Sequence, residues 1–251
     1  MSSTKNSIVL VDTILLLHAC LDALADTTSL AVDLEGVALC RSGTLCIIQL
    51  KAAGSDTIYL VDVTVLHTSA FEEVSANGHS LKSIFESRAV KKLFFDVRND
   101  SDALYNLFGV TLANVYDLQL LEVAVRSSKP GRPPRFVKGL VSSLETYVAP
   151  LKSSAVVRDW TRVKEAGLLL FAPERGGRYE VFEDRPLPAA LKEYCAQDVA
   201  LLHELESALS RNIGRNWDQR VRTESAVRVA FAKKSNYTPR GPDKALVPTN
   251  W

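Results

Sequence analysis

The chain has 251 residues, of which 47% are hydrophobic and 24% are charged, and its formal net charge at pH 7 is +1. This length allows one large domain or two small ones with a sizeable apolar core. A nearly neutral chain is not drawn as a whole to nucleic acid or to a membrane surface, so any basic contact surface must be local.

The N-terminal segment, residues 8–25, is apolar enough to resemble a signal peptide, but two features argue against one. Asp12 interrupts it, and its longest wholly apolar run, residues 14–17, is too short for a membrane span. We therefore predict a buried helix with Asp12 as its N-cap, and no membrane contact. The four cysteines lie in apolar segments without CxxC spacing, as expected of reduced thiols. With no targeting signal apparent, these features predict an intracellular protein of the cytoplasm or nucleus.

Strand-like segments follow at residues 30–35, 45–50 and 57–63, and their short, turn-rich links predict an antiparallel meander. Strands and helices then alternate: a helix at 81–87, a strand at 90–95, a helix at 101–108 ended by Gly109, a strand at 114–116, and a helix from Asp117 with that aspartate as its N-cap. This order predicts an α/β fold with a mixed five-stranded sheet flanked by helices.

The first of these strands carries two carboxylates, Asp33 and Glu35, separated by one residue. Side chains alternate between the two faces of a strand, so both point the same way and lie only about 5–7 Å apart. Two such carboxylates repel each other unless a cation lies between them. A divalent metal ion is the simplest cation for that place.

Beyond residue 125, two segments concentrate positive charge. The first, residues 126–138, is a loop-like stretch with no acidic residue and five basic ones, which are Arg126, Lys129, Arg132, Arg135 and Lys138. The second extends from residue 211 to 234. A solvated surface and a contact with phosphate groups are about equally good explanations of either segment. Further helices are predicted at 136–148 and 156–165, and the last twelve or so residues read as an extended tail.

A helix predicted at residues 188–210 places a second acidic motif on an apolar stripe. Leu191, Cys195, Leu202 and Leu205 form the stripe, and Tyr194 and Asp198 are one turn apart on the same side. A buried aspartate costs several kcal/mol unless it is paired, protonated or bound to metal. If this helix packs over the strand of Asp33 and Glu35, three carboxylates converge beside a tyrosine hydroxyl. Such oxygen ligands suit Mg²⁺ or Mn²⁺ better than zinc.

Between these motifs lies the segment Phe95-Asp96-Val97-Arg98-Asn99-Asp100-Ser101-Asp102. With Asp33-x-Glu35 before it and Tyr194-xxx-Asp198 after it, the sequence resembles the DEDD superfamily of 3′-5′ exonucleases with tyrosine in the last motif, as in ribonuclease D. Within that superfamily it is similar to the exonuclease domain-containing, Egalitarian-like branch. The resemblance covers roughly residues 8–210 and implies a ribonuclease H-like sheet with a helical C-terminal part.

The resemblance implies a role for each motif. Asp33, Glu35, Asp100 and Asp198 would bind two divalent cations, Mg²⁺ or Mn²⁺, about 3.5–4 Å apart. Asp33 would bridge both ions, and Glu35 and Tyr194 would orient the attacking water. Asp100 is preferred as the second-motif ligand because it stands four residues before Leu104 and nine before Gly109, as in ribonuclease D-like sequences. Asp96 and Asp102 are the alternatives, and Phe95 departs from the histidine usual in Egalitarian-like members.

The implied function is hydrolysis of single-stranded nucleic acid, with RNA favoured and DNA also open, from the 3′ end to nucleoside 5′-monophosphates. Arg132, Arg135 and Lys138 would guide the backbone of that strand. The alternative is a nucleic-acid-binding adaptor that keeps the exonuclease fold, since some relatives in this branch lack ligands. Residues 1–210 would form the exonuclease domain, and residues 211–251 a basic helix and extended tail packed on or trailing it. The sequence leaves protein partners open.

Overall fold

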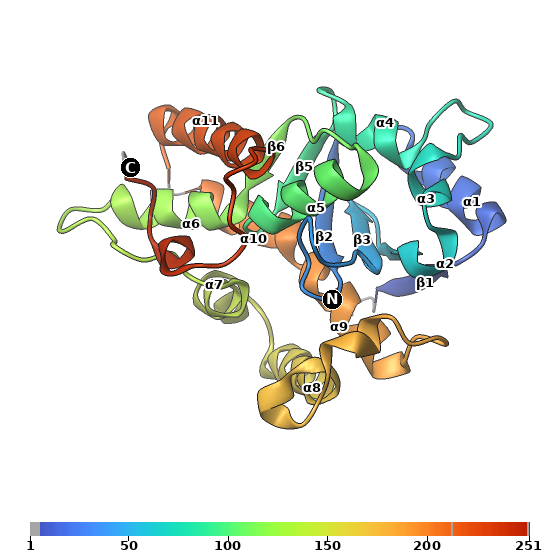
Figure 1. Ribbon diagram of the computed structural model, residues 1–251. Coiled ribbons are helices and arrows are strands. Elements are labelled where there is room, and N and C mark those ends of the chain that lie inside the picture. The colour runs from blue at the N-terminus through green and yellow to red at the C-terminus, as the bar shows by residue number, and fades with distance from the viewer. Residues whose placement is uncertain (1–5, 212, 250) are drawn as a thin grey trace.

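The computed structural model describes residues 6–211, 213–249 and 251. Within these residues, the centre of the molecule is a six-stranded mixed sheet in the order β1-β4-β3-β2-β5-β6 (Figure 1). The strands are β1 Ser7–Val11, β2 Ser29–Glu35, β3 Ile47–Ala52, β4 Thr57–Asp62, β5 Lys91–Phe94 and β6 Val115–Asp117. The predicted mixed α/β architecture is confirmed, with one strand more than the five expected.

The additional strand comes from the segment predicted as a single buried helix. Ser7–Val11 forms β1, which pairs in parallel with β4, and the helix α1 begins only at Ile14. Its N-cap is Thr13, whose Oγ1 accepts a hydrogen bond from the backbone N–H of Leu16 at 3.3 Å, so Asp12 was the wrong cap. The run Ile8-Val9-Leu10-Val11 is dominated by β-branched residues, which favour a strand.

The strand directions bring the acidic motifs to one edge of the sheet. β2, β3 and β4 form the predicted antiparallel meander, while β2, β5 and β6 are mutually parallel neighbours. The carboxyl ends of these three parallel strands therefore meet at the same edge. Open α/β sheets bind ligands beyond the carboxyl ends of such strands.

Helices cover both faces of the sheet around two apolar clusters. One cluster lies under α6, α9 and α10, and the other under α1, α3, α4 and α5 (Figure 1). The helices are α1 Ile14–Leu24, α2 Val63–Leu66, α3 Ser69–Glu72, α4 Leu81–Glu86, α5 Arg98–Phe108, α6 Leu118–Ser127, α7 Leu140–Tyr147, α8 Ser154–Phe171, α9 Ala189–Ala200, α10 Leu202–Ser210 and α11 Arg215–Ala232. None of the helices in the described residues is both long and apolar enough to cross a membrane.

Several helix limits differ from the prediction. The segment predicted as one helix over 188–210 is divided into α9 and α10 at Leu201, whose backbone φ of −111° and ψ of 5° lie outside the helical range. Both halves still bury their apolar residues in the same cluster. Helix α5 starts three residues earlier than predicted, so Asp100 lies in its first turn, and it ends as predicted at Gly109, which adopts a φ of 62°.

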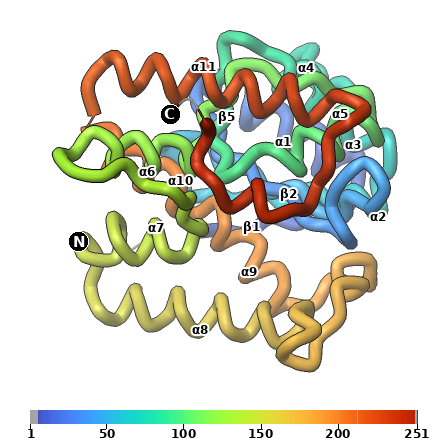
Figure 2. The backbone as a smooth tube through the Cα atoms, turned by 60° about the vertical axis from the view of Figure 1, so that its left-hand side comes forward, coloured from blue at the N-terminus to red at the C-terminus, as the bar shows by residue number. Residues whose placement is uncertain are grey.

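The C-terminal part is helical, as predicted, and it lies against the sheet. Helix α11 contacts β6, α5 and α6, and the chain then turns back past the end of α11 (Figure 2). The predicted extended tail contains one 3₁₀ turn, Pro242–Ala245. Leu246 next to this turn forms an antiparallel bridge with Phe136, so residues 136–139 are not part of helix α7 as predicted.

Candidate functional site

Strand β2 presents Asp33 and Glu35 on one face, as the alternation of side chains predicts. Leu30, Val32 and Leu34 point the other way and are buried in the cluster under α1, α3 and α4. The two carboxylates are half-buried at the end of the strand, on the face that α9 covers. The central position of β2, between β3 and β5, holds this pair rigidly in place.

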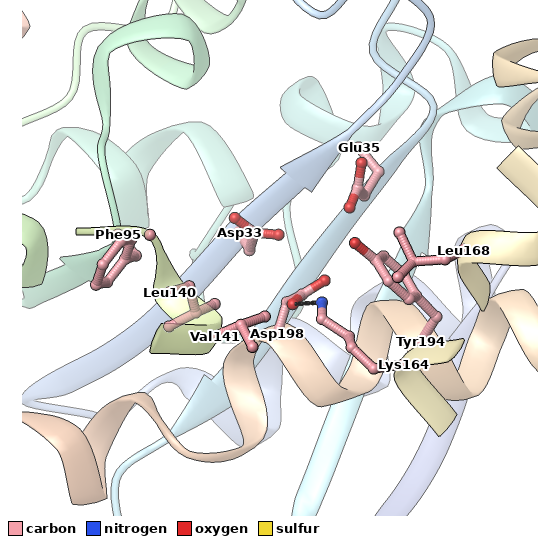
Figure 3. A pocket seen from close by; sticks show the side chains of 10 residues that line it. Asp33, Glu35, Phe95, Leu140, Val141, Lys164, Leu168, Tyr194 and Asp198 are labelled. Carbon is pink, nitrogen blue, oxygen red and sulfur yellow. Dashed lines mark hydrogen bonds and ion pairs between the residues drawn. The ribbon is translucent and has the colours of Figure 1, made fainter. Parts of the chain in front are cut away.

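Helix α9 brings the second acidic motif over the same strand. Leu191 and Cys195 are fully buried, and this fixes the rotation of the helix so that Tyr194 and Asp198 face β2. One ligand atom each from Asp33, Glu35 and Asp198 lies within 4.8 Å of the other two. Figure 3 shows the three carboxyl groups and the tyrosine hydroxyl pointing toward one another. The predicted convergence of these four residues is therefore what the structure shows.

These side chains line a cavity of about 370 Å³. Its other walls are mostly apolar and come from the β5–α5 turn (Phe95), the start of α7 (Gly139, Leu140 and Val141) and α8 (Leu168). Lys164, also on α8, completes the lining. Phe95 thus places an apolar ring in the wall where the family resemblance leads one to expect a histidine. The oxygen atoms that converge in the cavity are the donor type that hard divalent cations prefer.

Lys164 on α8 is a site residue that the sequence analysis missed. Its ammonium group donates a hydrogen bond to Asp198 Oδ1 and lies 3.9 Å from the centroid of the Tyr194 ring (Figure 3). Helix α8 comes this close because Gly167 faces Tyr194: a Cβ atom at residue 167 would lie 2.3 Å from Tyr194 Cδ2. Lys164 places a positive charge among three carboxylates in the absence of any metal ion.

Burial and mutual repulsion raise the pKa of the carboxyl groups in this cluster. For Asp33, burial raises the pKa most, followed by the charge of Asp198, while Lys164 lowers it. For Glu35, burial is again the largest cause, followed by Asp33. Burial also raises the pKa of Tyr194 far above its usual value. The tyrosine is therefore a neutral hydroxyl near pH 7, able to hydrogen-bond a water molecule but not to act as a base.

Lys164→Met should lower the stability of the metal-free protein by about 1.5–3 kcal/mol, because Asp198 would lose a hydrogen bond to a charged partner. It should also enlarge the stabilisation by Mn²⁺, since the ion would no longer compete with an ammonium group. Thermal denaturation with EDTA and with Mn²⁺ measures both effects. Lys152→Met is the matched control because Lys152 pairs with the exposed Glu204. Equal Mn²⁺ shifts for wild type and Lys164→Met would contradict this prediction.

The structure separates the three candidates for the second-motif aspartate. Asp102 is fully buried and accepts hydrogen bonds from Arg41 through the backbone N–H at 2.6 Å and Nε at 2.7 Å. Asp96 has a φ of 68° and is held by both Nε and Nη2 of Arg98 at 2.5 Å. Both carboxylates are therefore already paired with an arginine.

Asp100 differs from these two neighbours. Its carboxylate is buried and has no hydrogen bond or ion pair with any residue that the structure describes. Burial raises its pKa most, followed by the charge of Asp33. Asp100 does not belong to the group within 4.8 Å. It stands in the first turn of α5, the helix that follows β5, where the charges of Asp33 and Glu35 act on it.

Asp117 is the N-cap of α6, as predicted, but its carboxylate does more than cap. It accepts hydrogen bonds from the backbone N–H groups of Asp96 and Val97 at 3.0 and 3.2 Å, and from Nη1 of Arg228 at 2.7 Å. Arg228, from the second basic segment, is only 5% exposed. This buried ion pair joins α11 to the β5–α5 turn that leads to Asp100.

The three basic residues expected to guide the substrate lie outside the carboxylate cluster. Lys138 is drawn to the buried Glu122, with Nζ 3.7 Å from Oε1, and Arg126 binds the same carboxylate. Arg135 lies over the ring of Phe136 at 5.2 Å, and Arg132 is exposed. The loop that carries them ends at Gly139, which lines the cavity. Their contact with a substrate strand stays a prediction.

Comparisons with known proteins agree with this site. A family model described as 3′-5′ exonuclease matches residues 8–214. Piwi-interacting RNA (piRNA) biogenesis protein EXD1 of Mus musculus is 31% identical over 185 residues, which are 72% of this chain and 29% of that protein. EXD1 of Bombyx mori is 26% identical over 197 residues, which are 78% of this chain and 54% of that protein. The chain thus spans about half or less of the length of these relatives.

Solved structures show the same fold. The Trypanosoma brucei RNase D in complex with GMP superposes with a TM-score of 0.75 at 26% identity, covering 97% of this chain and 70% of that one. Escherichia coli RNase D superposes with a TM-score of 0.59 at 19% identity, covering 91% of this chain and 51% of that one.

Proposed function

Because this chain belongs to the DEDD family of 3′-5′ exonucleases, in the RNase D-like branch related to EXD1, we propose that it is a metal-dependent 3′-5′ exonuclease. Its substrate would be single-stranded nucleic acid, RNA rather than DNA, and its products nucleoside 5′-monophosphates. The observation that carries this proposal is the convergence of Asp33, Glu35 and Asp198 within 4.8 Å beside the Tyr194 hydroxyl. The preference for RNA rests on the names of the relatives, a piRNA biogenesis protein and RNase D.

The family uses divalent metal, and the residues of the cavity fit such an ion. Their donor atoms are all carboxylate oxygens, and a cation, the Lys164 ammonium, is already held among them. We assign Asp33, Glu35, Asp100 and Asp198 as the ligands of two ions, Mg²⁺ or Mn²⁺. These ions would supply the activation of water and the stabilisation of the leaving 3′-oxygen.

The protein's own groups would orient the reactants. The neutral Tyr194 hydroxyl would hydrogen-bond the water that attacks the scissile phosphate, and Glu35 would hold the same water from the opposite side. Attack forms a bond from the water oxygen to phosphorus as the water gives up a proton, the bond to the 3′-oxygen breaks, and that oxygen takes up a proton. Phe95, Leu140 and Leu168 in the cavity wall would limit access of other water molecules. Arg132, Arg135 and Lys138 would attract the backbone of the incoming strand.

The test of this proposal uses 5′-labelled single-stranded RNA and DNA of one sequence, with Mn²⁺, Mg²⁺ or EDTA. A ladder that shortens from the 3′ end and requires metal is the expected result. Intact substrate that is nevertheless bound would support the second candidate, an adaptor that binds nucleic acid without cutting it. The ion pair of Lys164 with Asp198 favours that candidate, because it neutralises part of the cluster without a metal ion.

Asp100→Asn should reduce the rate of cleavage more than about 100-fold. Removal of a residue that hydrogen-bonds to a metal ligand already costs 10–100-fold, and loss of the ligand itself should cost more. The stability of this variant should be unchanged or higher, because the Asp100 carboxylate is buried without a cationic partner. Asp102→Asn should instead cost about 3–5 kcal/mol of stability, because Arg41 loses its carboxylate partner, yet retain cleavage below its melting temperature. Rate assays and thermal denaturation separate the two. Loss of cleavage only in Asp102→Asn would make Asp102 the ligand.

A further inference from the structure

The first turn of helix α5 carries Asp100 but has no side-chain cap. Helices usually begin with a Ser, Thr, Asp or Asn residue whose side-chain oxygen accepts hydrogen bonds from the first backbone N–H groups. Here the N-cap residue is Val97, which has no such oxygen. The Asp117 carboxylate holds the N–H groups of Asp96 and Val97, which precede the turn. The turn itself therefore depends on contacts from elsewhere in the chain.

Contacts that hold this turn come from the C-terminal part of the chain. Residues 233–249, here called the C-terminal strap, follow α11 and run back across the molecule (Figure 2). Arg98 Nη2 donates a hydrogen bond to the carbonyl of Lys244 at 2.9 Å, and Tyr237 Oη donates one to Asn99 Oδ1 at 2.6 Å. The two residues that directly precede the metal-ligand candidate of this turn are therefore both attached to the strap.

Arg41 joins the strap to the residue two positions after Asp100. Its backbone N–H and Nε donate to the Asp102 carboxylate at 2.6 and 2.7 Å. Its Nη2 donates to the carbonyls of Ala232 and Lys234, where α11 ends and the strap begins, at 2.9 and 2.8 Å. The turn is thus held before and after Asp100, whereas the Asp100 carboxylate has no hydrogen bond or ion pair within the described residues.

Tyr237 is fixed by its ring as well as by its hydroxyl group. It is only 4% exposed, and Lys244 Nζ lies 4.1 Å from the centroid of its ring. The ring of Phe231, at the end of α11, packs edge-on against it with 5.8 Å between centroids. Because these contacts involve the ring, removal of the hydroxyl alone releases Asn99 and leaves the packing of the strap in place.

We propose that the C-terminal strap positions Asp100 for metal binding, with the Tyr237 hydroxyl and the Lys244 carbonyl as the groups that fix the first turn of α5. The inference rests on the proposed function, in which Asp100 is a ligand of a divalent cation. A functional side chain must be held within about 0.5 Å of its working position, and an unpaired carboxylate can be held only through its backbone. The strap lies beyond residue 214, where the match to the 3′-5′ exonuclease family ends.

The test compares two variants that each lose one buried tyrosine hydroxyl. Tyr237→Phe removes the group that holds Asn99. Tyr116→Phe is the matched control, because Tyr116 is also buried and its Oη donates to Asp218 of α11 at 2.7 Å. Both variants should melt about 2–4 °C below wild type, the shift expected for one hydrogen bond in a chain of this size. Stability alone therefore does not separate them.

Titration of the protein with Mn²⁺, followed by electron paramagnetic resonance of the unbound ion, measures metal affinity without substrate. Tyr237→Phe should weaken Mn²⁺ binding about tenfold, the lower end of the range for residues that hold a metal ligand in place. Asn99→Leu should have the same effect, and the double variant should bind no more weakly than either single variant, because one hydrogen bond is lost in all three. Tyr116→Phe should bind as wild type does. Wild-type affinity in Tyr237→Phe, or an equal loss in Tyr116→Phe, would overturn the role of the strap.

Asp100→Asn and a cleavage assay distinguish these outcomes from failure of the proposed function. Weaker Mn²⁺ binding in Asp100→Asn but not in Tyr237→Phe would retain Asp100 as a ligand and overturn the positioning role. Unchanged Mn²⁺ binding in Asp100→Asn would overturn both. Mn²⁺ binding that weakens in both variants, without cleavage of RNA or DNA by wild type, would retain the positioning role and overturn the exonuclease.

Discussion

Replacing Asp33 with asparagine should reduce cleavage of a single-stranded 3′ end more than about 100-fold while leaving the metal-free protein at least as stable as the wild type. The substitution keeps the shape of the side chain and removes one negative charge from a cluster of carboxylates within 4.8 Å. Burial and the charge of Asp198 raise the pKa of Asp33, so its ionised form destabilises the folded protein in the absence of metal. Activity and metal-free stability should therefore change in opposite directions.

Cleavage assays and thermal denaturation in EDTA measure both effects of Asp33→Asn. Asp62→Asn is the control, because Asp62 is a fully buried aspartate that accepts hydrogen bonds from Nε and Nη2 of Arg185, each at 2.5 Å. That control should lose stability and keep cleavage at temperatures where it is folded. A loss of stability in Asp33→Asn similar to that in Asp62→Asn would contradict this prediction. It would show that Asp33 pairs with a positively charged side chain of the protein and is not a metal ligand.

The second large effect expected is a pH dependence of stability that metal removes. The pKa values of Asp33, Glu35, Asp100 and Asp198 are all raised in the folded protein, chiefly by burial. Carboxyl groups with raised pKa values bind protons more tightly in the folded than in the unfolded protein. Their contribution to the stability of the folded protein is therefore fully present below their pKa values in the unfolded chain, about 3.9 for aspartate and 4.3 for glutamate. It is lost as the pH rises through their pKa values in the folded protein.

Divalent metal should reverse this loss, because it binds only the ionised carboxylates of the folded protein. At a concentration of 100 times the dissociation constant, Mn²⁺ should add about 2.7 kcal/mol. For a chain of this size that corresponds to a rise of about 5–10 °C in the melting temperature. Denaturation in EDTA and in Mn²⁺ from pH 4 to pH 8 tests this, with Asp33→Asn as the variant that should respond least. A shift by Mn²⁺ as large at pH 4 as at pH 8 would show that the ion binds elsewhere.

The parts of the site that could be predicted from the sequence are those set by local periodicity. Asp33 and Glu35 share a face because side chains alternate along a strand, and Tyr194 and Asp198 share one because they are a helical turn apart. Both expectations agree with the structure. The family resemblance supplied the order of the motifs, and the match over residues 8–214 confirms that family.

The parts that could not be predicted depend on contacts between distant segments. Lys164 lies in an ordinary amphipathic helix, and only the packing of α8 on α9 places it beside Asp198. The preference for Asp100 over Asp96 and Asp102 rested on the spacing in related sequences alone, because the arginine partners of the other two, Arg98 and Arg41, become evident only in the fold. The first strand was missed for a similar reason: β1 is recognisable by its pairing with β4, whereas in the sequence only Asp12 and Thr13 separate its short apolar run from that of α1.

The ion pair of Asp117 with Arg228 limits where this protein can be truncated. The match to the exonuclease family ends at residue 214, whereas Arg228 lies in α11, after that limit. A chain shortened to the matching segment would lack the cation that pairs with the Asp117 carboxylate, and it would uncover the faces of β6, α5 and α6 that α11 contacts. It would also loosen the turn whose backbone N–H groups Asp117 holds, immediately before Asp100. The folding unit is thus longer than the segment that matches the family model, and boundaries for expression belong after α11.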